Sequence, residues 1–248
     1  MLWVKINKIM PERIALVIHH EFLILTVPKI LIVAATKFEL KPLLDRFNIS
    51  INMAEGLFKP TSGSMDVSVL ITGVGMVNTA FNLGKYLNVS YNYIINIGIC
   101  GAFDRNLKIG EIVNVAEDCL SEMGAQDDLK FIKFSELGLG GSNCYSNHIK
   151  TNYAPFRNLK KVKGITVNTV HGNEESIKKT ISLFTPDVES MEGAAFFRAC
   201  ENMKANYFQL RAVSNYVEKR EKSNWNIPLA IQNVNEFTIK LIENLNQN

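Results

Sequence analysis

Blocks of apolar residues alternate with polar segments along the chain, and their lengths predict strands and helices in turn. The continuous apolar run 30–35 has the length and the β-branched content of a strand buried on both faces. Similar runs predict further strands at 66–72, 93–97, 112–116, 164–167 and 207–213. Spacing and capping signals predict helices after Thr36, at 78–87, from residue 192 and at 228–245. This alternation predicts a mostly parallel sheet covered by helices.

Two regions depart from the alternation. In residues 1–28, three basic residues precede an apolar run at 14–18, as in a signal peptide, but no small-residue cleavage site follows. We therefore expect 1–28 to be an N-terminal extension, either disordered or a non-native start, and 29–248 to be the folded domain. The polar, glycine-containing stretch 121–163 predicts loops that lie over a site or at an interface.

Composition narrows the function classes. A chain of 248 residues that is 47% hydrophobic can close one large core, so we expect a single domain. The net charge of +3 is spread along the chain without a basic stripe, which argues against a nucleic-acid partner, and no membrane-spanning segment is expected. The four cysteines lack metal-ligand spacing, which fits buried thiols in a reducing compartment and a cytoplasmic enzyme without a metal: Cys100, Cys119, Cys144 and Cys200.

Polar and glycine residues gather where the predicted strands end. In a parallel sheet, ligands bind at the carboxyl ends of the strands, so one pocket could collect these residues: Glu39, Gly73 to Gly75, Gly98 to Gly101, Asn168, Ser214 and Asn215. The glycine segments complete neither a dinucleotide-binding nor a phosphate-loop pattern, and tight strand exits explain them almost as well. Glu192 stands out because it opens an apolar helix, where burying a carboxylate costs free energy. Such a cost suggests a ligand that needs the carboxylate.

Several of these segments together resemble the nucleoside phosphorylase and nucleosidase superfamily. The resemblance runs from about Lys29 to the C-terminus, and the order of its motifs matters more than any single one. The motifs are ILIVAATKFEL at 30–40, TGVG at 72–75, NIGICGA at 96–102, GEIV at 110–113, MEGAA at 191–195 and RAVSN at 211–215. Within the superfamily the chain is most similar to the futalosine hydrolases. The resemblance implies a three-layer α/β/α domain with a twisted, mostly parallel sheet, and a homo-oligomer.

The implied reaction is cleavage of the N-glycosidic bond of a purine nucleoside, without a metal or organic cofactor. The substrate would be futalosine, the products hypoxanthine and dehypoxanthine futalosine, and the pathway menaquinone biosynthesis. By resemblance, Glu192 would bind the ribose hydroxyls while Met191 lies against the sugar. A fixed anion beside the developing oxocarbenium ion lowers the barrier, and losing such a group costs about a hundredfold or more in rate.

Glu39 decides between hydrolysis and phosphorolysis. By resemblance it stands where nucleosidases hold the carboxylate that activates water, whereas phosphorylases present a glycine and arginines to phosphate. An anion at this position repels phosphate and can accept a proton from water. Alternatively, Glu39 is a solvent-facing residue in the first turn of a helix, favoured there by the helix dipole. Lys37 keeps a phosphate site open.

Asn215 stands where adenine-specific relatives carry an aspartate that protonates the base. An amide can donate a hydrogen bond to O6 of a 6-oxopurine or to a ring nitrogen, but it cannot deliver a proton as a carboxylic acid can. Hypoxanthine therefore fits better than adenine. Alternatively, Asn215 caps a turn after its strand. Ser214 could orient the amide or simply finish the strand.

The remaining assignments are less specific. Gly101 joins Met191 and Ser214 in the expected substrate-binding set, and His171 could stack on the purine or satisfy a loop. Ile99 and Cys100 replace residues that are small or polar in related nucleosidases. Residues that could hold the benzoate-bearing half of futalosine, or simply lie at the surface, are Glu189, Arg220 and Trp225.

Two other functions stay open. One is a phosphate-dependent purine nucleoside phosphorylase of the inosine type. The other is a nucleoside-binding protein that has lost turnover, for which Ile99 and Cys100 are the motivating residues.

Overall fold

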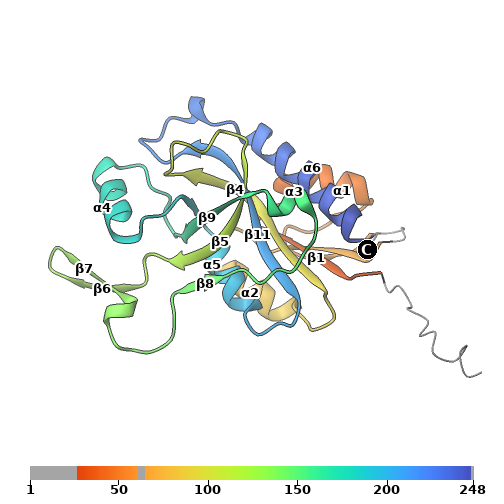
Figure 1. The fold of residues 1–248 in the computed structure, drawn as a ribbon, viewed down its shortest axis with the longest axis horizontal. Helices are drawn as coiled ribbons and strands as arrows, with labels where there is room; N and C mark the ends of the chain where they lie inside the picture. Colours follow the sequence, from red (N-terminus) through yellow and green to blue (C-terminus); the bar gives the residue numbers. More distant parts are fainter. Residues whose placement is uncertain (1–26, 61–64, 247–248) are drawn as a thin grey trace, which may run out of the picture.

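The protein is described by a computed structural model that covers residues 27–60 and 65–246. Its central element is a mixed, mostly parallel sheet (Figure 1) in the order β10-β9-β5-β11-β4-β1-β3-β2. The strands that position the site are β1 (Ile30–Ala34), β4 (Tyr93–Ala102), β10 (Val188–Ser190) and β11 (Asn206–Tyr216). The others are β2 (Gly56–Phe58), β3 (Val67–Ile71), β5 (Ile112–Leu120), β8 (Cys144–Ser146) and β9 (Lys160–Thr166).

Helices cover both faces of this sheet (Figure 1), which confirms the predicted α/β class and the layered architecture. On one face lie α1 (Lys41–Phe47) and α6 (Ile227–Leu245), and on the other α2 (Met76–Tyr86) and α5 (Gly193–Cys200). Strand β1 shows why both faces are apolar. Its residues Ile30 and Ile32 belong to the same core cluster as Val234 of α6, while Leu31 and Val33 pack with Phe196 and Phe197 of α5. The prediction of a strand buried on both faces is confirmed.

The remaining elements are the hairpin β6 (Gly124–Asp127) and β7 (Lys130–Lys133), the helices α3 (Ala154–Arg157) and α4 (Glu174–Phe184), and short 3-10 helices at Lys37–Leu40, Phe134–Glu136 and Lys222–Asn224. Helix α3 places Phe156 in the same core cluster as α6. The stretch 121–163, predicted as loops, thus contains a hairpin, strand β8, a short helix and the start of β9. Helix α4 was not predicted. The expectation for residues 1–28 falls almost entirely on residues 1–26, which lie outside the described residues.

Strands β4, β5, β9 and β11 are longer than predicted, and in β4 and β11 this changes the place of several site residues. Strand β4 continues through Gly98 and Gly101, which pair with β11 and do not end the strand. Strand β11 likewise continues through Ser214 and Asn215. The polar residues therefore sit inside paired strands, where hydrogen bonding to neighbours fixes the backbone that carries them.

The expectation of four free thiols is wrong for two of the cysteines. Cys119 of β5 and Cys144 of β8 face each other across an antiparallel pair and form a disulfide. Their distance in sequence gave no sign of this contact, which depends on β8 returning to the edge of β5. Cys100 and Cys200 are free and buried, and burial raises the pKa of the Cys100 thiol to about 12. In the described part of the chain, no helix is both long and apolar enough to span a membrane.

Candidate active site

A cavity of about 400 Å³ opens at the carboxyl ends of β1, β4 and β11. It is lined by all seven residues that the sequence assigned to a site: Glu39, Gly101, His171, Met191, Glu192, Ser214 and Asn215. The cavity wall also includes Ile99 and Cys100. Asn168, expected at the same edge, binds Glu122 and does not line the cavity. Gly73, Gly75 and Gly98 do not line it either, so the cavity collects only part of the expected set. The roles assigned to its members stay predictions.

Glu192 is the N-cap residue of α5 and is buried, with 8% of its surface exposed. Its Oε1 accepts a hydrogen bond of 3.0 Å from the backbone N–H of Gly75 at the start of α2. Gly75 has a φ of +93°, a conformation that strongly favours glycine, so this turn presents its N–H to the carboxylate. The second oxygen lies 3.8 Å from Nη2 of Arg211. The carboxylate is held from two sides at the edge of the cavity.

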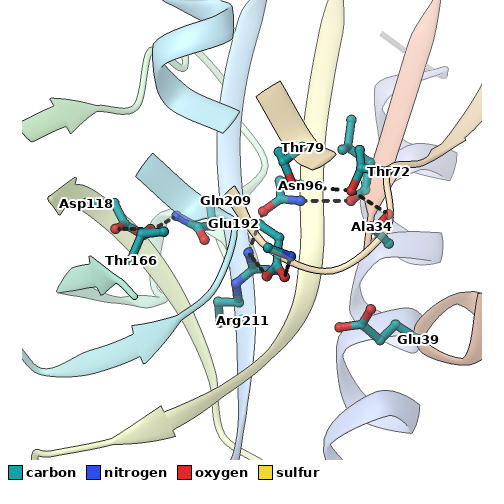
Figure 2. A network of polar contacts seen from close by, with 12 residues as sticks. Ala34, Glu39, Thr72, Thr79, Asn96, Asp118, Thr166, Glu192, Gln209 and Arg211 are labelled. Atoms are coloured by element: carbon teal, nitrogen blue, oxygen red, sulfur yellow. Dashed lines mark hydrogen bonds and ion pairs between the residues drawn. The ribbon is translucent and has the colours of Figure 1, made fainter. Parts of the chain in front are cut away.

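Arg211 is a buried cation in the middle of β11, and sequence reasoning gave it no role. Its Nη2 donates a hydrogen bond of 2.6 Å to Oδ1 of Asn96 on β4 (Figure 2). Gly98 makes room for it, because a methyl group there would lie 2.5 Å from Arg211 Nη1 and 2.8 Å from Glu39 Oε1. The signal that could have revealed Arg211 is a charged residue inside the apolar run 207–213, since unpaired buried charges are rarely tolerated.

Glu39, like Arg211, lies close to Gly98. Figure 2 shows the Glu39 carboxylate pointing toward the Glu192–Arg211 pair. Its Oε2 accepts hydrogen bonds from the backbone N–H of Thr36 at 3.0 Å and from Thr36 Oγ1 at 3.1 Å. This capping box fixes the side chain. Desolvation, followed by the charge of Glu192, raises the pKa of the Glu39 carboxyl, while Arg211 opposes the rise. A carboxylate of raised pKa is a better proton acceptor, as a general base requires.

A β-bulge in β11 sets the direction of the Asn215 side chain. Between Val213 and Asn215 the register of β11 against β4 shifts, so that Ser214 is the extra residue and Asn215 pairs with Gly101. The hydroxyl of Ser214 donates to Asn215 Oδ1 at 2.7 Å, and Asn215 Nδ2 donates to the carbonyl of Tyr216 at 2.9 Å. The carbonyl of Tyr216 can only accept, so this contact fixes which end of the amide carries the N–H groups. The contacts among the described residues leave one amide N–H available.

His171 and Glu189 form a second pair in the cavity wall. Glu189 accepts from the backbone N–H of His171 at 3.0 Å, and its other oxygen lies 2.6 Å from Nδ1 of the ring. The other ring nitrogen, Nε2, lies 2.9 Å from the hydroxyl of Thr180. The ring is therefore locked in place and packs edge-on against Phe103. Stacking of His171 on a purine stays a prediction.

Asp118 lies under the first turn of α5, outside the cavity lining, and was also missed (Figure 2). Its carboxylate accepts from Thr166 Oγ1 at 2.7 Å and from Gln209 Nε2 at 3.0 Å. Thr166 in turn accepts from the backbone N–H of Ala194 at 2.7 Å. Burial raises the pKa of Asp118 to about 6. This network fixes the turn that carries Glu192, and only the assembled sheet brings its members together.

The charges around the cavity are mainly negative. Of the described residues that line it, Arg220 alone carries a permanent positive charge, against the carboxyl groups of Glu39, Glu189, Glu192 and Glu218. Arg211 does not line the cavity, but it lies next to Glu192 and neutralises part of this negative charge. The arrangement can stabilise a cation that develops between Glu39 and Glu192, and it can hold a water molecule as a nucleophile.

Comparisons with known proteins agree with this geometry. The family model described as the phosphorylase superfamily matches residues 29–246. The futalosine hydrolase of Thermus thermophilus is 30% identical over 162 residues, which are 63% of this chain and 72% of that protein. A 5'-methylthioadenosine/S-adenosylhomocysteine nucleosidase of Colwellia psychrerythraea is 24% identical over 180 residues, 62% of this chain and 68% of that protein. The structure of Helicobacter pylori futalosine hydrolase shares the fold, with a TM-score of 0.74 at 16% identity, over 88% of this chain and 98% of that one.

Proposed function

The chain belongs to the phosphorylase superfamily and is an N-glycosyl hydrolase of purine nucleosides, and we propose that its substrate is futalosine. The products would be hypoxanthine and dehypoxanthine futalosine, as in menaquinone biosynthesis. The observation that carries the proposal is the meeting of Glu39, Glu192 and Asn215 in one cavity. Each has a separate role in the reaction.

Glu192 stabilises the sugar. As the bond from the ribose to the purine stretches, positive charge grows on the ribose ring, and a nearby fixed anion lowers the energy of that state. The contacts with Gly75 and Arg211 hold the carboxylate in place before the substrate arrives, so little reorganisation is needed. The same carboxylate can accept hydrogen bonds from ribose hydroxyls. Met191, which lines the cavity one residue earlier, supplies an apolar contact to the sugar.

Glu39 takes a proton from the attacking water. Thr36 occupies one carboxylate oxygen, while the other lies next to Gly98, across from Arg211. Inorganic phosphate is disfavoured at this place because it would meet two carboxylates, and the neighbouring guanidinium is already paired with Glu192 and Asn96. Water is neutral, so the two carboxylates do not repel it. The charge distribution therefore supports hydrolysis over phosphorolysis.

Asn215 binds the departing base through its free amide N–H. A 6-oxopurine offers acceptors at O6 and N7, and a hydrogen bond there supports the negative charge that gathers on the leaving base. The amide cannot act as an acid, so the base leaves as an anion with hydrogen-bond support from Asn215 and takes its proton from water.

Arg220 and Trp225 support futalosine over smaller nucleosides. Both line the cavity, and the guanidinium carbon of Arg220 lies 5.0 Å from the centre of the Trp225 ring. An aromatic wall with a cation above it suits a benzoate, whose ring can pack on the indole while its carboxylate pairs with the guanidinium. A methylthio group is uncharged and would form no ion pair with the Arg220 guanidinium.

The test is turnover of futalosine, inosine, methylthioadenosine and adenosylhomocysteine by the purified protein, with and without phosphate. We expect futalosine to give the highest kcat/KM and phosphate to make no difference. A requirement for phosphate would identify a phosphorylase instead. Faster turnover of the adenine nucleosides would identify a different nucleosidase, and binding of hypoxanthine without any product would identify a binding protein.

A further inference from the structure

Gly101 is flanked by two polar side chains that point to the same face of the sheet. It pairs with Glu189 of β10 on one side and with Asn215 of β11 on the other. Residues paired across neighbouring strands project to the same face. A methyl group on Gly101 would lie 3.0 Å from Val217 Cγ2, 3.4 Å from Asn215 Nδ2 and 3.5 Å from Glu189 Cγ. The absence of a side chain at Gly101 therefore lets the side chains of Asn215 and Glu189 approach each other, and we call the part of the cavity wall between them the slot.

The carboxylate of Glu189 is buried, with 4% of the residue exposed, and it forms part of the cavity wall. The reaction described above gives it no role. Both hydrogen bonds that it receives come from His171, one from the backbone and one from the ring. An ionised carboxylate has about four acceptor positions, so the contacts within the described residues leave capacity on each oxygen. A buried carboxylate fixed in this way, with acceptors to spare, is suited to binding a donor on a ligand.

The donors and acceptors of the slot match one type of purine. A 6-oxopurine carries a donor, N1–H, next to the acceptors O6 and N7, whereas adenine carries an acceptor at N1 and a donor at its amino group. Asn215 has a free N–H for the acceptors, and Glu189 offers only acceptors when ionised. Adenine would place the lone pair of N1 against a carboxylate and leave both without a partner, which a buried site rejects strongly.

We propose that Glu189 is a specificity-determining residue that accepts the N1–H of a 6-oxopurine while Asn215 donates to its O6 or N7. His171 positions the Glu189 carboxylate through its backbone and ring contacts. This inference rests on the proposed nucleosidase function and deepens it. It also replaces the role in benzoate binding that the sequence suggested for Glu189, because a carboxylate repels another carboxylate.

The test compares free bases as inhibitors of whichever nucleoside the wild-type protein hydrolyses. The probes are hypoxanthine, 1-methylhypoxanthine, which lacks the N1–H, and adenine. A hydrogen bond to a charged acceptor predicts that wild-type protein prefers hypoxanthine over 1-methylhypoxanthine by about tenfold to a hundredfold. In Glu189→Gln, which keeps the shape of the side chain, this ratio should fall toward the value set by the bulk of the methyl group, and adenine should bind more tightly. Purely steric rejection of the methyl group would persist unchanged in the variant.

Glu218→Gln is the matched control, because it removes another carboxylate of the cavity wall that does not flank Gly101. Its inhibition ratios should equal those of the wild type. Equal binding of hypoxanthine and 1-methylhypoxanthine by the wild-type protein would overturn the proposal even if Glu189→Gln failed to fold. Turnover tests the proposed function and the inhibition ratios test Glu189, so either can fail without the other.

Discussion

Replacing Glu192 by glutamine removes a single negative charge from beside the sugar and changes little else. The amide retains an oxygen that can accept the hydrogen bond from Gly75, and it has the size of the carboxylate. Its other end, an NH2 group, must face Arg211 where the carboxylate oxygen stood 3.8 Å away. The variant therefore tests the charge more than the shape.

The magnitude follows from Coulomb's law. Two unit charges about 4 Å apart in surroundings of effective dielectric about 20 attract by about 4 kcal/mol. Arg211 neutralises part of the field of Glu192, so we expect about 3 kcal/mol of that stabilisation to reach the transition state, which corresponds to a loss of about a hundredfold in kcat. The assay is steady-state turnover of futalosine, with thermal unfolding measured in parallel to verify that the variant is folded.

Glu174→Gln is the control for this experiment, since Glu174 lies in the first turn of α4 and pairs with Lys178 at the surface. It should leave kcat unchanged. A folded Glu192→Gln protein with kcat within threefold of the wild type would refute the assignment of Glu192 to charge stabilisation.

Three further predictions concern selectivity and stability. Asn215→Asp should shift the ratio of kcat/KM toward adenine nucleosides by at least about tenfold, because it restores a group that can protonate the base; an unchanged ratio would show that residue 215 does not read the purine. The pKa of Asp118, about 6 when folded against about 4 when unfolded, means that the folded state binds the proton more tightly, so this group's contribution to stability is fully present below pH 4 and falls by about 3 kcal/mol in all as the pH rises through 6 to neutrality. Urea unfolding across this range should show a fall that is missing in Asp118→Asn, and equal slopes in both proteins would contradict the value. Reduction of the Cys119–Cys144 disulfide should lower the free energy of unfolding by about 3 kcal/mol, as expected for a loop of 25 residues, and Cys144→Ser should show no response to reductant.

The fold was predictable because its strands are buried on both faces. Such strands read as uninterrupted apolar runs, and β1 is the clearest case. Strand ends were less predictable, since a buried strand can continue through polar residues when its neighbours pair with it. Ser214 and Asn215 are the example: the sequence placed them after the strand, whereas pairing with β4 keeps them within it.

The candidate site was predictable only where a motif carried it. Glu39, Glu192 and Asn215 each stand next to a recognisable strand or helix end, and the cavity contains all three. Arg211 and Asp118 act through contacts between segments far apart in sequence, and the sequence, which suggested Glu189 for the benzoate, did not reveal its pairing with His171. The hydrogen bond from Gln209 to Asp118, for example, joins residues 91 positions apart, so no local pattern could reveal it. The disulfide was missed for the same reason.

The central claim is that water, activated by Glu39, attacks the ribose of a nucleoside held by Glu192 and Asn215. The most direct test is to run the reaction in ¹⁸O-labelled water with excess inorganic phosphate and to analyse the sugar product by mass spectrometry. Our account predicts that the free sugar carries the heavy oxygen at the anomeric carbon and that no sugar phosphate forms. A sugar 1-phosphate, or a free sugar without the label, would contradict it.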